Sequence, residues 1–352
     1  GISASVGGNM PDQRTIRVSL VATPEVDVSA LGGLHGVLNS VAHMVPGKVS
    51  FRANVVVPDS VLECAEPGGN IITNVMGMPL PMQTRLSKVD QTDVLIIPSL
   101  YLLTSNWPRD PYPDLTEWIR RMHQRGSLIC SACTGAMLLA ETGLLDGHEA
   151  TQHWAFEALF REHFPRVRLN IDKVLLITGA SNRIIMSGAS AAWHDLVLYL
   201  IARYSSPKAA RIIAKFFLLN SHTDGQAPYI IFQDNRQHGD GVILAAQQWL
   251  QAHSHLPHPL EQAQQNSGLS PRTFRRRFCQ ATGLSPIRYV QQLRITQAKS
   301  ELEETDIPVD EISWRVGYED PAFFRRLFKR ITGMTPKMYR RKFQLPDPGR
   351  SR

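Results

Sequence analysis

The chain has 352 residues, is 43% hydrophobic and 8% aromatic, and carries a formal net charge of +7. This length favours two domains over a single core, and the composition excludes a disordered or fibrous protein. No apolar run approaches the roughly 18 residues that cross a bilayer, so we expect no membrane partner.

The net charge is concentrated in the last third of the chain. Residues 1–237 contain 20 basic and 20 acidic residues, whereas residues 238–352 contain 18 basic and 11 acidic ones. A neutral body with a basic end is typical of a module that binds a polyanion, although a solvated basic face would give the same count.

Residues 1–14 are small and polar, and we expect a disordered arm or a cloning remnant with no secretion signal. Residues 15–232 then alternate β-rich runs with helical patterns. The strand candidates are residues 15–21, 51–57, 94–98, 127–130, 174–178 and 184–187, and the helix candidates are residues 29–41, 114–125, 134–142, 152–162, 191–204 and 207–219. This alternation predicts an α/β sandwich, with a mostly parallel sheet covered on both faces.

The rest of the chain is predicted to be helical. Residues 233–241 are polar and turn-forming, which favours a linker. Residues 242–343 contain only helical patterns, and residues 344–352 are expected to be a disordered tail.

The helical end contains an internal repeat. Eight residues recur 50 positions later, which indicates two copies of one supersecondary unit. They are Phe274, Arg275, Arg276, Phe278, Thr282, Gly283, Pro286 and Tyr289, repeated as Phe324, Arg325, Arg326, Phe328, Thr332, Gly333, Pro336 and Tyr339.

Each copy has the pattern of a helix-turn-helix unit. A short helix and a glycine turn precede a basic second helix, which begins at Ser270-Pro271 in one copy and Asp320-Pro321 in the other. The candidate DNA-contacting residues are Arg272, Thr273, Arg275, Arg276, Gln280, Ala322, Arg325, Arg326 and Lys329. Arginine suits this task because its planar guanidinium can pair with both acceptors of guanine in the major groove.

One long helix is predicted between the two copies, at residues 286–304. It would be about 28 Å long, at 1.5 Å per residue, which suits two DNA-reading helices in adjacent major grooves, roughly 34 Å apart.

The segments Gly268-Leu-Ser-Pro-Arg-Thr-Phe-Arg-Arg-Arg-Phe278 and Gly317-Tyr-Glu-Asp-Pro-Ala-Phe-Phe-Arg-Arg-Leu-Phe328, followed by Gly333-Met-Thr-Pro-Lys-Met-Tyr-Arg340, resemble the DNA-binding domains of the AraC/XylS family. The resemblance implies double-stranded promoter DNA as a partner, with RNA polymerase as a further one.

The front region contains a candidate nucleophile. Cys133 lies between small residues where a strand turns into a helix, a position that lifts a side chain out of a sheet, and His153 follows as a possible base. The candidate pocket residues are Cys133, Thr134, His153, Trp154, Trp193 and His194. Cys130 and Cys133 could also form a redox pair, or Cys130 could be a buried strand residue. No metal-ligand spacing is present, and we expect neither a metal nor a cofactor.

This turn resembles the ThiJ/PfpI branch of the class I glutamine-amidotransferase-like fold, which is flavodoxin-like. The pairing with an AraC-type end is similar to the GlxA family of regulators. Thr134 stands where catalytic relatives often have histidine, the apolar Val28 stands where an acidic neighbour is expected, and Pro98-Ser99-Leu100 replaces Pro-Gly-Gly. These departures favour a non-catalytic ligand-sensing domain; a cysteine-dependent hydrolase or amidase with a DNA-binding tail is the alternative.

The sequence therefore predicts a transcription regulator that responds to a small metabolite. Its four scattered cysteines fit a reducing cytoplasm, and the resemblance implies a homodimer. Trp107, Trp154 and Trp193 could bind an amine or quaternary amine through cation–π contacts, but such tryptophans are more often core residues.

Overall fold

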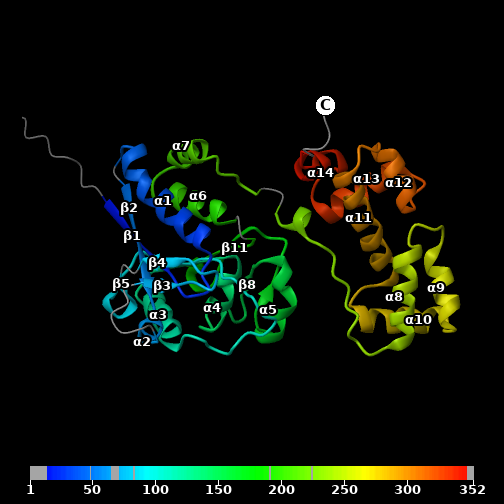
Figure 1. The fold of residues 1–352 in the computed structure, drawn as a ribbon, viewed down its shortest axis with the longest axis horizontal. Helices are drawn as coiled ribbons and strands as arrows, with labels where there is room; N and C mark the ends of the chain where they lie inside the picture. Colours follow the sequence, from blue (N-terminus) through cyan, green and yellow to red (C-terminus); the bar gives the residue numbers. More distant parts are fainter. Residues whose placement is uncertain are drawn as a thin grey trace, which may run out of the picture. The chain divides into compact units, whose positions relative to one another are not determined.

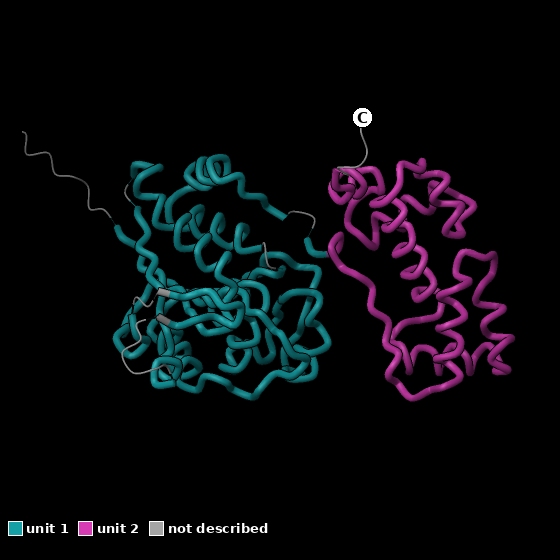
Figure 2. The backbone as a smooth tube through the Cα atoms, in the orientation of Figure 1, with its two compact units in different colours: residues 1–226 teal, residues 227–352 magenta. Residues whose placement is uncertain are grey.

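The computed structural model describes residues 14–47, 49–64, 71–81, 84–189, 192–222 and 225–346. The predicted arm, apart from Arg14, and the predicted tail beyond residue 346 lie outside these residues. The chain forms two compact units, Gly1–Gln226 and Ala227–Arg352 (Figure 2).

The first unit is built on a seven-stranded sheet, in the order β10-β11-β7-β6-β1-β2-β5 (Figure 1). All neighbouring pairs are parallel except β10 and β11. The strands are β1 (Arg14–Val21), β2 (Val49–Val57), β5 (Thr84–Arg85), β6 (Val94–Ile97), β7 (Leu128–Ala132), β10 (Leu175–Thr178) and β11 (Ile184–Ser187). The mostly parallel sheet confirms the predicted fold class, and all six predicted strands are present.

Four very short strands form two separate ribbons. They are β3 (Ile71–Thr73) with β4 (Pro79–Pro81), and β8 (Glu149–Ala150) with β9 (Arg168–Leu169). None of the four was predicted, because two or three residues are too few to show an alternating pattern.

Helices cover both faces of the sheet, and each face has its own apolar core (Figure 1). One core lies under α1 (Val28–Met44), α6 (Trp193–Tyr204) and α7 (Pro207–Phe217), and the other under α3 (Pro113–Gln124), α4 (Ala136–Ala140) and α5 (Glu157–His163); α2 (Asp59–Glu63) follows β2. Alternation along the strands divides the side chains between the cores: Leu20 enters the first and Val21 the second.

The second unit is helical. Its helices are α8 (Gly241–His253), α9 (Pro259–Ser267), α10 (Pro271–Thr282), α11 (Pro286–Glu304), α12 (Val309–Val316), α13 (Pro321–Thr332) and α14 (Pro336–Phe343). One apolar cluster joins α8, α9 and α10 to the start of α11, and a second joins the rest of α11 to α12, α13 and α14. No helix in the described ranges is long and apolar enough to span a membrane.

The repeat predicted from sequence is also a repeat of packing. The rings of Phe278 and Tyr289 meet edge to face with centroids 5.1 Å apart, and those of Phe328 and Tyr339 do so at 5.4 Å. The hydroxyl groups of Thr282 and Thr332 each donate to the backbone carbonyl four residues earlier, at 2.8 Å in both copies. The same residues therefore perform the same structural task in each unit.

The predicted helix starts have the expected caps. The side chains of Ser270 and Asp320 accept backbone N–H groups at the starts of α10 and α13, and those of Ser285 and Thr335 do so at α11 and α14. Each cap satisfies donors that an α-helix leaves unpaired.

The structure differs from the linker interpretation of residues 233–241. The two units divide at Gln226, and the later polar stretch is hydrogen-bonded to the second unit. The Asp234 carboxylate accepts the Tyr289 hydroxyl at 2.6 Å, and Asp240 caps α8. Polar residues that suit a solvated linker here pair with partners far away in the sequence.

Two adjacent glycines of α1 give a matched test of the packing between α1 and α6. A Cβ added at Gly33 would overlap the indole ring of Trp193, whereas one at Gly32 would meet nothing within 4 Å. We expect Gly32→Ala to raise the free energy of unfolding by up to about 1 kcal/mol through helix propensity. Gly33→Ala should lower it by about 1–2 kcal/mol, because the ring must move. Urea denaturation measures both changes, and equal effects would contradict this packing.

Candidate functional site

The first candidate interface is the exposed face of α10. Phe274 and Phe278 are buried against α8, α9 and α11. On the opposite face Arg272, Arg275 and Arg276 are exposed, and among the described residues none of the three forms an ion pair. These guanidinium groups are available to an external anion or to a base edge.

The second helix-turn-helix unit presents the equivalent face of α13. Phe324 and Phe328 are buried, and Arg325 and Arg326 are exposed. Arg325 differs from its counterpart because it pairs with Asp310 of α12; both side chains of this pair are about half exposed. Such an exposed pair is worth at most about 1 kcal/mol, so a nucleic-acid ligand can displace it.

The structure places the remaining predicted residues on the same two faces. Gln280 is exposed and Thr273 half-buried on α10, while Ala322 and Lys329 are exposed on α13. The surface positions agree with a DNA-contacting role, and the role itself stays a prediction.

Two arginines of the helical second half, one on α10 and one on α11, have structural roles. Arg277 pairs with Asp240 at 2.7 Å, and this contact holds the pKa of the Asp240 carboxyl below its usual value. Arg294 is buried, donates to the backbone carbonyls of Ser254 and Leu256, and lies 4.8 Å from the centre of the Tyr318 ring. Neither residue was predicted from the sequence, because their side-chain partners are 24 or more positions away and their other partners are backbone atoms.

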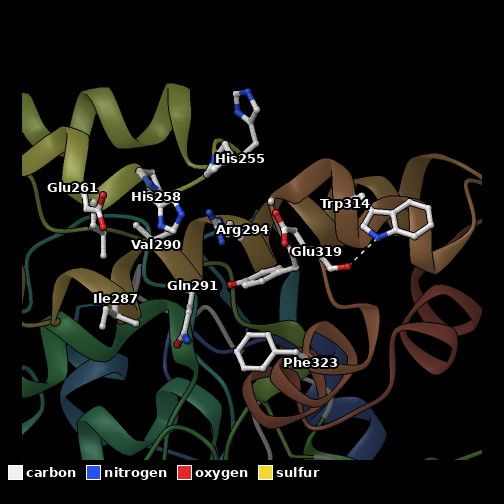
Figure 3. A pocket seen from close by; sticks show the side chains of 15 residues that line it. His255, His258, Glu261, Ile287, Val290, Gln291, Arg294, Trp314, Glu319 and Phe323 are labelled. Atoms are coloured by element: carbon white, nitrogen blue, oxygen red, sulfur yellow. Dashed lines mark hydrogen bonds between the residues drawn. The ribbon is translucent and has the colours of Figure 1, made fainter.

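A groove of about 700 Å³ separates the two helix-turn-helix units, with α11 as its floor (Figure 3). His255, His258 and Glu261 line one side, and the other carries the half-exposed rings of Trp314 and Phe323. Nothing in the sequence analysis predicted this groove.

The candidate pocket of the first unit lies at the carboxyl edge of its sheet. Cys133 directly follows β7 and has a φ of 53°, a left-handed conformation that is costly for any residue except glycine. The chain then forms a tight turn, Cys133–Gly135, before the short α4. The predicted helix over residues 134–142 is therefore shorter than expected. The strand–turn–helix geometry agrees with an elbow.

Other polar side chains end at the same edge. In the parallel sheet β1 pairs with β6, and β6 with β7, so the residues that follow these three strands lie side by side. The hydroxyls of Thr23 after β1, Ser99 after β6 and Ser131 near the end of β7 are buried with no hydrogen-bond partner among the described residues. Unpaired buried hydroxyls are costly, which is a reason to expect a ligand near them.

Thr134 forms two hydrogen bonds with the backbone of one residue, Leu100. Its buried hydroxyl donates to the Leu100 carbonyl at 2.6 Å and accepts the Leu100 N–H at 2.7 Å. A Cβ on Gly135 would overlap the backbone at Ile97 and Pro98, so the turn packs directly onto the end of β6. This contact fixes the elbow against the neighbouring strand.

His153 and Trp154 lie in a loop that Gln226 holds. The buried Gln226 side chain donates to the carbonyls of Gln152 and Lys173 at 2.8 and 3.1 Å, and it accepts the Trp154 N–H at 3.1 Å. It also fills the space beside Gly188, directly after β11, which brings the loop to the carboxyl edge of the sheet. Burial lowers the pKa of His153.

Trp193 and His194 begin α6, after β11. The Trp193 indole packs against Gly33 and the first core, so it is in part a core residue. The ring centroids of His194 and Trp193 are 4.3 Å apart. Burial lowers the pKa of His194. The Nδ1 atom of His222, a third ring near the start of α6, is hydrogen-bonded to the Asp195 carboxylate at 2.6 Å.

Both cysteines of the Cys-x-x-Cys segment are buried. Cys130 is fully buried on β7, and desolvation raises the pKa of its thiol far above the usual value. Among the described residues, neither cysteine forms a disulfide. The buried Cys130 thiol, with its raised pKa, is therefore structural and not a nucleophile. Within the described ranges no group of three or more histidine, cysteine, aspartate or glutamate residues could hold a metal ion.

Each of the two compact units contains a segment that matches a known protein family. The helix-turn-helix domain model matches residues 265–342, and the DJ-1/PfpI family model matches residues 46–167. The chain is 27% identical over 239 residues to the HTH-type transcriptional regulator CdhR of Pseudomonas aeruginosa, a match that covers 67% of this chain and 69% of that protein. It is 26% identical over 225 residues to the HTH-type transcriptional regulator GlxA of Rhizobium meliloti, covering 64% and 68%. The crystal structure of an AraC family transcriptional regulator from Pseudomonas putida is 15% identical, with a TM-score of 0.46, over 57% of this chain and 99% of that one.

The chain therefore joins a DJ-1/PfpI domain to a DNA-binding helix-turn-helix domain of the AraC type. Its relatives over about two thirds of the chain are named transcriptional regulators, and this protein is a transcriptional regulator of that two-domain kind.

Proposed function

We propose that the protein binds a specific promoter site as a regulator and reads two adjacent major grooves with α10 and α13. The observation that carries this proposal is the repeated packing of the two units, which leaves the paired arginines Arg275 and Arg276, and Arg325 and Arg326, exposed at equivalent positions. Base-reading contacts would come from these side chains, and phosphate contacts from their neighbours.

The first unit is proposed to bind a small effector beside Cys133 without turning it over. Three buried hydroxyls without partners at the edge of the sheet support a polar ligand there, and Trp154 suits the amine or quaternary-amine class suggested by the sequence. We further propose a cytoplasmic homodimer, with RNA polymerase as an additional partner.

The competing function is that of a cysteine-dependent hydrolase or amidase. The left-handed backbone at Cys133 favours it, because such strain is typical of a nucleophile elbow. Against it, Thr134 stands where catalytic relatives often have histidine, and its hydroxyl bonds to the Leu100 backbone. The nearby carboxylates are also engaged: Glu25 accepts the Tyr112 hydroxyl at 2.7 Å, and Asp27 caps α1.

A Cys133→Ser variant separates the two functions. We expect promoter control in cells to stay within about twofold of wild type, because a sensor needs the pocket and not a nucleophile. A reporter assay measures this, with Cys64→Ser at an exposed site as the control. Loss of control in the Cys133 variant alone, together with loss of a hydrolytic activity of the wild type, would instead establish the enzyme.

Footprinting on genomic DNA tests the proposed DNA recognition. We expect one discrete protected site of about two helical turns per protomer. On that site Arg275→Ala and Arg325→Ala should each cost about 1–3 kcal/mol and relax the preference for one base pair. Competition binding against single-base variants of the site measures this, with Arg211→Ala on the surface of α7 as the control. Equal losses on every sequence would show that the arginines contact only phosphate.

A further inference from the structure

The segment 227–240, here called the strap, is attached to the second helix-turn-helix unit at its start. The ring of Tyr229 meets that of Phe343 edge to face, with centroids 5.2 Å apart. The Lys342 ammonium lies 5.0 Å from the centre of the Tyr229 ring. Both partners belong to α14 and its end.

The strap then reaches the first helix-turn-helix unit. Phe232 packs edge to face on Tyr289 at 5.7 Å, and Asp234 accepts the hydroxyl of the same tyrosine. The Asn235 side chain donates to the carbonyl of Ala281 at the end of α10, at 3.1 Å. Aromatic residues only three positions apart, Tyr229 and Phe232, thus contact different units.

Between these contacts the strap is bonded to α11 itself. The Lys299 ammonium donates to the carbonyl of Ile230 at 2.8 Å and lies 5.8 Å from the centre of the Tyr339 ring. Burial lowers the pKa of Lys299 to about 8, although the charge of Glu303 opposes this shift. Lys299 is partly buried, and an ammonium group taken out of water needs polar partners such as this carbonyl.

The strap ends in an ion pair. The Asp240 carboxylate accepts two bonds from the Arg277 guanidinium on α10, at 2.7 and 3.0 Å. The strap therefore contacts α14, α11 and α10 in turn, and it connects the two helix-turn-helix units independently of the turns between their helices.

The residue directly before the strap is Gln226, the side chain that holds the candidate pocket loop. Its side chain is fully buried and makes its hydrogen bonds to residues 151–154 and to Lys173. Its backbone N–H donates to the carbonyl of Asp172, so both its backbone and its side chain are fixed to the first unit. A rearrangement of the loop must therefore shift the first residue of the strap or break these bonds.

We propose that the strap is a positioning segment for DNA recognition: together with α11 it holds the two helix-turn-helix units at their separation, and its start is joined directly to Gln226, which is bonded to the pocket loop. A change at the pocket loop then alters DNA affinity through chain continuity alone. This inference rests on the proposed function, because it needs a specific DNA site as its readout.

A double-mutant cycle on the full-length chain tests the proposal. Gln226→Met keeps a side chain of similar size and removes its side-chain hydrogen bonds in the first unit, and Phe232→Ala removes the ring contact between the strap and Tyr289. We expect each single variant to weaken binding to the footprinted site at least fivefold. In the Phe232→Ala background, Gln226→Met should weaken DNA binding by less than a further twofold, because the coupling through the strap is already impaired.

Trp118→Phe is the matched control. It removes another buried hydrogen bond of the first unit, from the indole N–H to the Val89 carbonyl at 2.9 Å, without touching the loop. Its DNA affinity should equal that of wild type. Two results would overturn the role of the strap. One is an unchanged DNA affinity in Gln226→Met; the other is a double variant whose loss of affinity equals the product of the two single losses. Absence of any specific site for the wild type would overturn the proposed function instead.

Two further variants keep the test decisive if the first ones fail to fold. Thr151→Val removes a hydroxyl that accepts from Gln226 and donates to the Lys173 carbonyl. Lys299→Met removes the hydrogen bond from α11 to the Ile230 carbonyl of the strap. The same non-additive pattern is expected from this pair, and thermal unfolding of each variant verifies that both units are folded.

Discussion

Side chains buried along α11 attach both helix-turn-helix units to a single helix. Tyr289 is fully buried in the first apolar cluster, and Ile295, Ala298 and Leu302 are fully buried in the second. A helix of 19 residues is about 28 Å long and does not change its length. The positions of α10 and α13, and therefore of their exposed arginines, depend on this packing, and the strap bonds to the same helix on its way between the units.

Packing, and not ion pairing, determines where the exposed arginines of α10 and α13 lie. The exposed arginines of α10 and α13 lie opposite a buried phenylalanine face, so packing and not ion pairing sets their direction. The weak pair between Arg325 and Asp310 gives one of these arginines a partner that DNA can replace. Arg277 has the opposite role, since its pair with Asp240 belongs to the fold. The arginines of α10 and α13 thus divide between a structural role and the proposed recognition role according to which face of the helix they occupy.

Local patterns in the sequence predicted the elements whose causes are local. The 50-residue repeat gave matching ring contacts at Tyr289 and Tyr339, and the Ser-Pro and Thr-Pro starts gave the caps of α11 and α14. The strap was not predicted as one segment, because residues 227–232 were assigned to the front domain and residues 233–240 have the polar composition of a linker. Its partners are also distant in the sequence: Asp234 and Tyr289 are 55 positions apart. The partners of the Thr134 hydroxyl and the hydrogen bonds of Gln226 were missed for the same reason: the partner atoms are backbone groups of distant segments. At the candidate site, the sequence predicted which residues are exposed on α10 and α13, while the contacts around Cys133 depend on how separate strands end.

The dependence of affinity on the spacing between the two half-sites tests the central claim most directly. Once the DNA site is known, one base pair, and separately ten base pairs, would be inserted between the two protected major-groove segments. A rigid α11 predicts that each insertion weakens binding by the full contribution of one unit, because the second recognition helix can no longer reach its groove. Unchanged affinity after the ten-base-pair insertion, which restores the helical phase, would show that the units move independently and would contradict the account.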